Sequence, residues 1–156
     1  MFKKNSLLWL ALVFLLLTGC QTAPRLPRVD LAQPGWTTRQ GQAVWRERTG
    51  EPEIAGELLV ATRADGACLV EFTKTPLPMI VLQTTTNAWQ FQYVPANRTY
   101  SGRGAPPTRV AVWLHLARCL AGSPPPKLWQ WNVQTKNSWR LANPYSGEFL
   151  EGYLAP

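Results

Sequence analysis

Apolar and polar residues alternate with a period of two over most of the chain after residue 57, which is typical of β-strands that bury one face. Residues 57–63 and 67–73 flank an Asp-Gly turn and are predicted to form a hairpin. Residues 79–85 and 87–94 form a second predicted pair, in which large aromatic side chains alternate with glutamines. The sequence therefore predicts a mainly β domain built on an antiparallel sheet.

Further strands are predicted on both sides of these hairpins. Residues 128–133, 138–142 and 148–154 repeat the same alternation, with Trp, Leu or Phe on one face. An earlier strand is indicated within residues 36–48, where Val44 and Trp45 occur. The folded domain is predicted to span residues 37–156, a length that suffices for a core without disulfide bonds.

One segment, residues 107–122, has the period of a helix instead. Its apolar residues recur at spacings of three and four, and prolines and a glycine flank it. The stripe consists of Val110, Trp113, Leu114, Ala117, Leu120 and Ala121. Because a sheet with one apolar face needs a cover, we expect this helix to lie across the sheet as a lid.

The N-terminus has the order of a secretory signal. Lys3 and Lys4 precede an apolar run over residues 7–17, which is shorter than the roughly 20 residues of a membrane-spanning helix. The Leu-Thr-Gly-Cys sequence that ends at Cys20 resembles a lipobox, and this resemblance implies acylation of Cys20 and removal of residues 1–19. Gln21 rather than Asp follows the cysteine, and resemblance to known sorting signals then favours the outer membrane over retention at the inner membrane.

Residues 20–36 are rich in proline and lack an apolar period, so they are predicted to be a flexible tether between the lipid and the domain. Loss of Lys3 and Lys4 with the signal lowers the formal net charge by two, from +7 to +5. The arginines are scattered along the mature chain and form no dense patch, which argues against nucleic-acid binding. A weak attraction to anionic lipid head groups or acidic partners is expected instead.

Sequence support for catalysis or a cofactor is slight. His115 and Cys119 lie four residues apart, as a thiol and its base would on a helix, but both are predicted to lie off the apolar stripe, at the surface. Together with Cys68 they have no recognised metal-ligand spacing, and the sequence indicates no cofactor. A disulfide between Cys68 and Cys119 is permitted in an oxidising compartment, and the sequence leaves it open.

The chain resembles the LolA and LolB family of lipoprotein carriers and receptors. The resemblance covers residues 56–156 and is carried by the lipobox, the strand-rich body, the Lys-Thr-Pro-Leu-Pro sequence at residues 74–78, the aromatic strand at 89–93 and the Leu-Ala-Gly-Ser-Pro sequence at 120–124. It implies an incomplete antiparallel β-barrel, a curved sheet closed by a helical lid, whose apolar interior holds acyl chains. It also implies that Leu77 projects towards the membrane, although Pro78 stands where the receptor has glycine.

The expected site is therefore an acyl-binding cavity together with a membrane-insertion loop at Leu77. The cavity candidates are Phe72, Trp89, Phe91, Tyr93, Trp113, Ala117, Trp129, Trp131 and Trp139. A solidly filled core would show the same pattern, and a Leu77 tucked back onto the sheet is the alternative to a projecting one.

Two functions follow from these alternatives. In the first, a lipid-anchored protein binds acyl chains of lipoproteins or lipids and helps to transfer them to the outer membrane, with a periplasmic carrier as a possible partner and no covalent chemistry. In the second, an outer-membrane lipoprotein with a solid core contacts an envelope partner and carries no lipid cargo.

Overall fold

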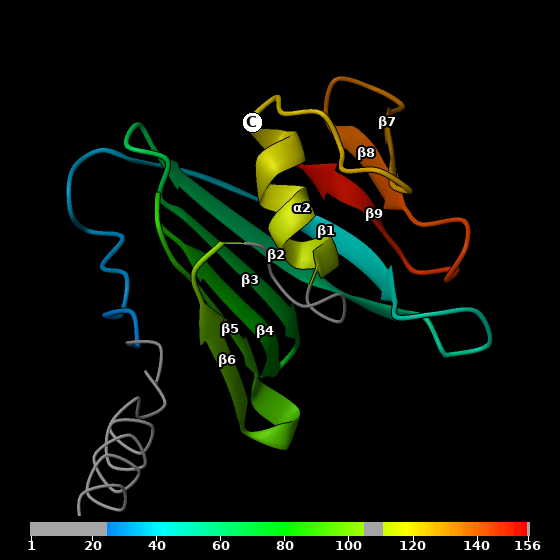
Figure 1. Cartoon of the computed structure of the whole chain (residues 1–156), viewed down its shortest axis with the longest axis horizontal. Coiled ribbons are helices and arrows are strands. Elements are labelled where there is room, and N and C mark those ends of the chain that lie inside the picture. Colours follow the sequence, from blue (N-terminus) through cyan, green and yellow to red (C-terminus); the bar gives the residue numbers. More distant parts are fainter. Residues whose placement is uncertain (1–24, 105–110, 156) are drawn as a thin grey trace, which may run out of the picture.

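The computed structural model describes residues 25–104 and 111–155. Within them, nine strands form one antiparallel sheet in the order β6-β5-β4-β3-β2-β1-β9-β8-β7, and a single helix lies against one face (Figure 1). The predicted signal, Cys20 and the first residues of the predicted helix, 107–110, lie outside the described residues. The elements are β1 (Trp36–Arg46), β2 (Ile54–Arg63), β3 (Cys68–Lys74), β4 (Leu77–Thr84), β5 (Trp89–Tyr93), the short 3₁₀ helix η1 (Val94–Ala96), β6 (Arg98–Gly102), α2 (Ala111–Leu120), β7 (Gln130–Val133), β8 (Ser138–Ala142) and β9 (Phe149–Leu154).

The sheet confirms the mainly β prediction and both predicted hairpins, because β2 pairs with β3 and β4 pairs with β5. It is open and not strongly curled, since β6 and β7 end it at opposite edges (Figure 1). Strand β6 was not predicted: it is an edge strand, and none of its five residues is buried, so its sequence lacks the alternation that burial imposes.

Strand β1 joins the two halves of the sheet, because it pairs with β2 on one side and with β9 on the other. Gly41 on β1 and Gly152 on β9 allow the second pairing. A Cβ atom at either glycine would overlap the backbone of the opposite strand, so a side chain at either position is expected to force the two strands apart.

The core lies between the sheet and α2. Trp113 of α2 is fully buried, with its ring centroid 5.2 Å from that of Phe72 on β3 and 5.5 Å from that of Trp45 on β1. Aromatic pairs at these separations add about 0.5–1.5 kcal/mol each to the effect of burial. We call these three rings the packed centre.

The helix buries a wider face than the predicted one, because Trp113, Leu114 and Ala117 of the predicted stripe are buried as expected but are not alone. Val112, Leu116 and Cys119 are buried in the core, whereas Ala121, which the predicted stripe included, is exposed. The prediction that His115 and Cys119 lie at the surface was therefore wrong for Cys119, while His115 is half-buried. The reason is that α2 is covered on two sides: the chain that follows it brings the ring of Trp129 to 5.3 Å from that of His115.

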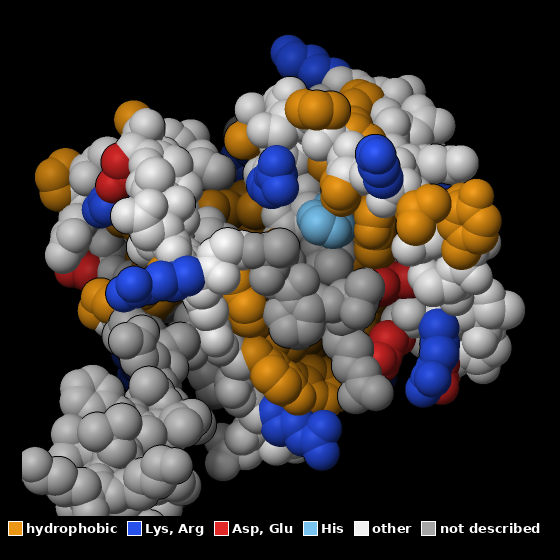
Figure 2. All heavy atoms as spheres, viewed as in Figure 1, with side chains coloured by type: hydrophobic (Ala, Val, Ile, Leu, Met, Phe, Trp, Pro, Cys, Tyr) orange, Lys and Arg blue, Asp and Glu red, His pale blue; other side chains and the backbone are white. Residues whose placement is uncertain are grey.

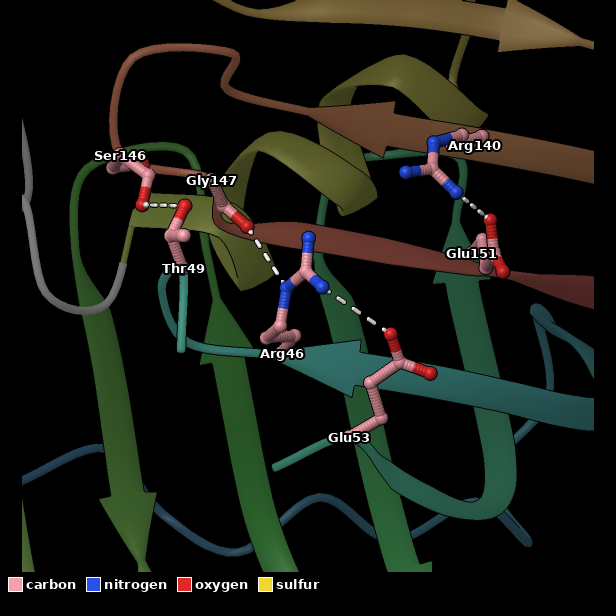
Figure 3. A network of polar contacts seen from close by, with 7 residues as sticks. All are labelled: Arg46, Thr49, Glu53, Arg140, Ser146, Gly147 and Glu151. Carbon is pink, nitrogen blue, oxygen red and sulfur yellow. Dashed lines mark hydrogen bonds and ion pairs between the residues drawn. The ribbon is translucent and has the colours of Figure 1, made fainter. Parts of the chain in front are cut away.

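Polar contacts fix the end of the sheet where β1 and β9 meet (Figure 3). Arg46 on β1 donates from Nε to the carbonyl oxygen of Gly147 and pairs with Glu53 across the β1–β2 loop. Arg140 pairs with Glu151 on the neighbouring strand. Both arginines lie over the buried ring of Phe149, at 4.5 and 4.4 Å from its centroid, so cations cover this part of the outer face.

Arg25, Leu26, Arg28 and Val29 of the predicted tether line a groove on the outer face of the sheet, the face away from α2. The backbone N–H of Leu26 donates to Oε1 of Gln90 on β5, at 2.9 Å. Gln90 lies between Trp89 and Phe91, which face the core, so its own side chain lies on the outer face. In Figure 1 the segment is the blue trace beside the green strands.

Candidate lipid pocket

A pocket of about 780 Å³ opens where α2 meets one end of the sheet. The β2–β3 turn and the β4–β5 turn form one wall, and Leu114, His115, Ala117 and Arg118 of α2 form the other. Trp89, at the start of β5, lines the pocket between these walls. We call this region the open end, because the same helix that fills the packed centre leaves space here.

Hydrogen bonds within and between the two turns shape the wall of the open end. Asp65 accepts a bond from the N–H of Ala67 and pairs with Arg63, whose guanidinium lowers the pKa of this carboxyl group. Thr85 accepts a bond from the N–H of Ala88, which closes the β4–β5 turn. The hydroxyl group of Thr86 donates to the carbonyl oxygen of Asp65 and so joins one turn to the other.

The interior of the open end is neutral at physiological pH. Burial, aided by the nearby charge of Arg118, lowers the pKa of His115 to about 4, so the imidazole is uncharged. Burial also raises the pKa of the Cys68 thiol to about 11. Cations therefore lie at the rim, on Arg63 and Arg118, while the groups inside carry no charge.

The two cysteines are separate buried thiols rather than a disulfide. Burial raises the pKa of Cys119 as well, so this sulfur is held as a thiol rather than as the reactive thiolate. Among the described contacts, no hydrogen bond joins Cys119 to His115. The direction of the Cys119 pKa shift is opposite to the one that activates a nucleophilic thiol.

Of the nine cavity candidates, two line the pocket: Trp89 and Ala117. Phe72 and Trp113 are fully buried in the packed centre. The structure thus divides the predicted lining between a filled region and an open one, which the sequence pattern alone does not distinguish.

The other five candidates lie along the rest of the inner face. Phe91 is buried beside the half-exposed Tyr100, and Tyr93 packs partly against the core. Trp131 and Trp139 stack on β7 and β8 with centroids 5.8 Å apart, and Trp129 contacts His115. Figure 2 shows hydrophobic side chains reaching the surface on this face over β4, β5 and β6, with basic side chains around them.

Several pocket residues were not predicted. The wall formed by the β4–β5 turn, Thr84 to Ala88, is polar and short, and it carries no pattern that marks a binding site. Leu114 belongs to the predicted helix stripe but has no predicted role in a site, and Arg118 is one of the arginines scattered along the sequence. The one sequence signal for the helix side of the pocket is the spacing of three and four that puts Leu114, Ala117, Arg118 and Ala121 on neighbouring positions of one helix surface.

Leu77 is the first residue of β4, directly after the β3–β4 turn, and its relative exposure is 65%. It therefore projects rather than tucking onto the sheet. The turn lies at the end of the sheet opposite the pocket, because β3 runs from Cys68 at the pocket to Lys74 at the turn.

No known family model matches the chain, and a search of curated proteins found no significant relative. Within the part of the chain that the structure describes, no helix is long and apolar enough to span a membrane.

Proposed function

We propose that this chain is a lipid-anchored envelope protein that binds acyl chains of lipoproteins or lipids in the open end and helps to transfer them to the outer membrane. The observation that carries the proposal is the neutral pocket of about 780 Å³ between α2 and the two turns. Small-molecule pockets commonly measure roughly 300–1,000 Å³, and each methylene that leaves water for such a site contributes about 0.8 kcal/mol.

The arrangement also agrees with the resemblance to the LolA and LolB family. A helix covers part of the inner face of an antiparallel sheet, as a lid covers an incomplete barrel, and Leu77 projects from a turn. A periplasmic carrier that delivers acylated proteins is the partner that this function requires.

Anchoring is tested separately from cargo. Cys20→Ser in the full-length precursor should block acylation and leave an uncleaved or soluble form, because the lipobox needs the thiol. Mass spectrometry of the native mature protein should find acyl groups on Cys20. A native mature protein that begins at another residue, without lipid, would contradict the anchoring part of the proposal.

Cargo binding is tested with the unanchored domain, residues 25–156, which is incubated with a membrane extract and purified again before its bound lipid is extracted. Acyl chains should be recovered with the protein by mass spectrometry. The alternative function, an interaction lipoprotein with a solid core, is favoured by the complete burial of Phe72 and Trp113. A well-folded domain that carries no acyl chain under these conditions would favour that alternative.

A further inference from the structure

The segment before β1 is attached to the sheet, which its composition does not predict. Leu26 is held by Gln90, and Asp30 makes its own turn, accepting a bond from the N–H of Ala32 at 3.0 Å. Leu26, Val29 and Leu31 are each half-buried. A free linker would expose all three side chains, so residues 25–31 have the properties of a bound strap.

The strap covers apolar surface on the outer face of the sheet. Leu69 on β3 and Gln83 on β4 face away from α2, and yet their relative exposures are only 3% and 8%. They line the same groove as Leu26 and Val29 of the strap. The outer face of β3 to β5 is therefore a second packing surface, which the strap occupies in part.

The groove continues past the strap towards the β3–β4 turn and η1. Its remaining wall consists of Glu71, Pro78, Val81, Gln92, Val94, Asn97 and Thr99. Three charged residues line the groove: Arg25 and Arg28 of the strap, and Glu71 on β3. Both arginines are exposed, and neither forms an ion pair within the described residues. This surface fits a partner that carries negative charge.

The strap also limits how far the domain can lie from its anchor. Four residues separate Arg25 from Cys20, and the five Cα–Cα steps of an extended chain between them span at most about 18 Å. A lipid on Cys20 would therefore bring the bilayer surface close to the outer face of β4, β5 and β6, rather than to β7 at the opposite edge of the sheet.

We propose that residues 25–31 are a strap that docks the domain on the membrane with the outer face of β4 to β6 towards anionic lipid head groups, which Arg25 and Arg28 contact. This orientation rests on the proposed acylation of Cys20, but it does not require the pocket to hold cargo.

Hydrogen exchange tests the strap in the mature protein. Amides of residues 25–31 should exchange more slowly than in an unstructured peptide, and Gln90→Ala should accelerate their exchange by removing the acceptor for Leu26. Gln92→Ala is the matched control, because it truncates the next glutamine on the same face without touching a recorded bond, and it should leave exchange unchanged. Exchange as fast as in the free peptide would overturn the strap.

Fluorescence quenching tests the orientation in vesicles of phosphatidylethanolamine and phosphatidylglycerol with nitroxide-labelled head groups. Thr99→Cys and Asn132→Cys place a fluorophore at exposed positions on β6 and β7, at opposite edges of the sheet, while Cys68 and Cys119 are buried. The lipidated protein should be quenched several times more strongly at residue 99 than at residue 132, and Gln90→Ala should reduce this contrast. Equal quenching at both positions would overturn the orientation.

Mass spectrometry of the same sample distinguishes failure of the anchor from failure of the docking. An acylated Cys20 with equal quenching contradicts the orientation alone. A Cys20 without lipid contradicts the anchoring and, with it, the membrane part of this inference, while hydrogen exchange still decides whether residues 25–31 bind the sheet.

Discussion

The packed centre and the open end lie under the same helix, but they differ in what fills the space between helix and sheet. At the packed centre, Trp113 of α2 meets Phe72 and Trp45, and the three rings leave no room for a ligand. At the open end, α2 presents Ala117 and half-buried His115 to two polar turns, and about 780 Å³ stays empty. A large side chain on α2, Trp113, thus fills the packed centre, whereas a small one, Ala117, leaves space for a ligand at the open end.

The largest effect that separates the two regions is expected at Trp113. Trp113→Asp should lower the free energy of unfolding by more than the roughly 3–5 kcal/mol that loss of a large buried aromatic costs, because it also buries a carboxylate without a partner. Urea unfolding measures this change. Arg118→Gln, on the exposed side of the same helix, should change stability by at most about 1 kcal/mol.

An equal, small effect of the two substitutions would mean that the centre is not packed. It would restore Trp113 to the cavity lining that the sequence predicts.

A second large effect should appear as the pH rises from 4.5 to about 8, and it arises beside the packed centre. Glu148 is buried near Trp45, and burial raises the pKa of its carboxyl group from 4.5 to about 8, while the indole N–H of Trp45 lowers it and the charge of Glu47 raises it. The indole nitrogen has no partner within hydrogen-bond geometry, so its effect is that of a nearby dipole. The neutral carboxyl group is therefore the form that the fold favours.

Because the folded-state pKa is raised, the stability that Glu148 contributes is fully present below pH 4.5 and is lost as the pH rises to about 8, at up to about 1.4 kcal/mol per pH unit. Glu148→Gln should remove most of this slope in urea unfolding measured across that range. Glu47→Gln should keep most of it, since burial is the first cause of the shift. An unchanged slope in Glu148→Gln would assign the pH dependence to another group.

The smallest effect on stability is expected at Leu77, which belongs to neither region. Its side chain is exposed, so Leu77→Glu should change stability by only about ±0.5 kcal/mol. It should still weaken lipid delivery, because a carboxylate enters the apolar boundary of a membrane at a cost that leucine does not have. Thermal unfolding and a vesicle transfer assay on the same variant measure both. A normal transfer rate would remove Leu77 from the functional residues.

The sequence predicted those features that depend on alternation along a strand. The hairpins β2–β3 and β4–β5, the late strands and helix α2 all follow from apolar residues at spacings of two, or of three and four. Edge strand β6 was not predictable, because its exposed residues lack the alternation of polar and apolar side chains. The burial of Cys119 was not predictable either, because α2 is covered from two directions.

The site was less predictable than the fold. Trp89 and Trp113 have the same local pattern, an aromatic residue on the inner face, yet one lines a pocket and the other is part of a solid core. The difference depends on how far α2 extends over the sheet and on the conformation of two turns, which are tertiary features. The strap over Gln90 is similar, since a proline-rich segment gives no signal of the surface on which it lies.

The central claim, that the open end binds acyl chains, is tested most directly by filling it. A fluorescent fatty-acyl probe should bind the purified domain and be displaced by lipoprotein acyl chains. Ala121→Trp places an indole in the pocket from an exposed position after α2 and should abolish probe binding, while Ala96→Trp, exposed in η1 at the other end of the sheet, should leave binding intact. Equal binding by both variants and the wild type, or no binding by a folded wild type, would contradict the claim.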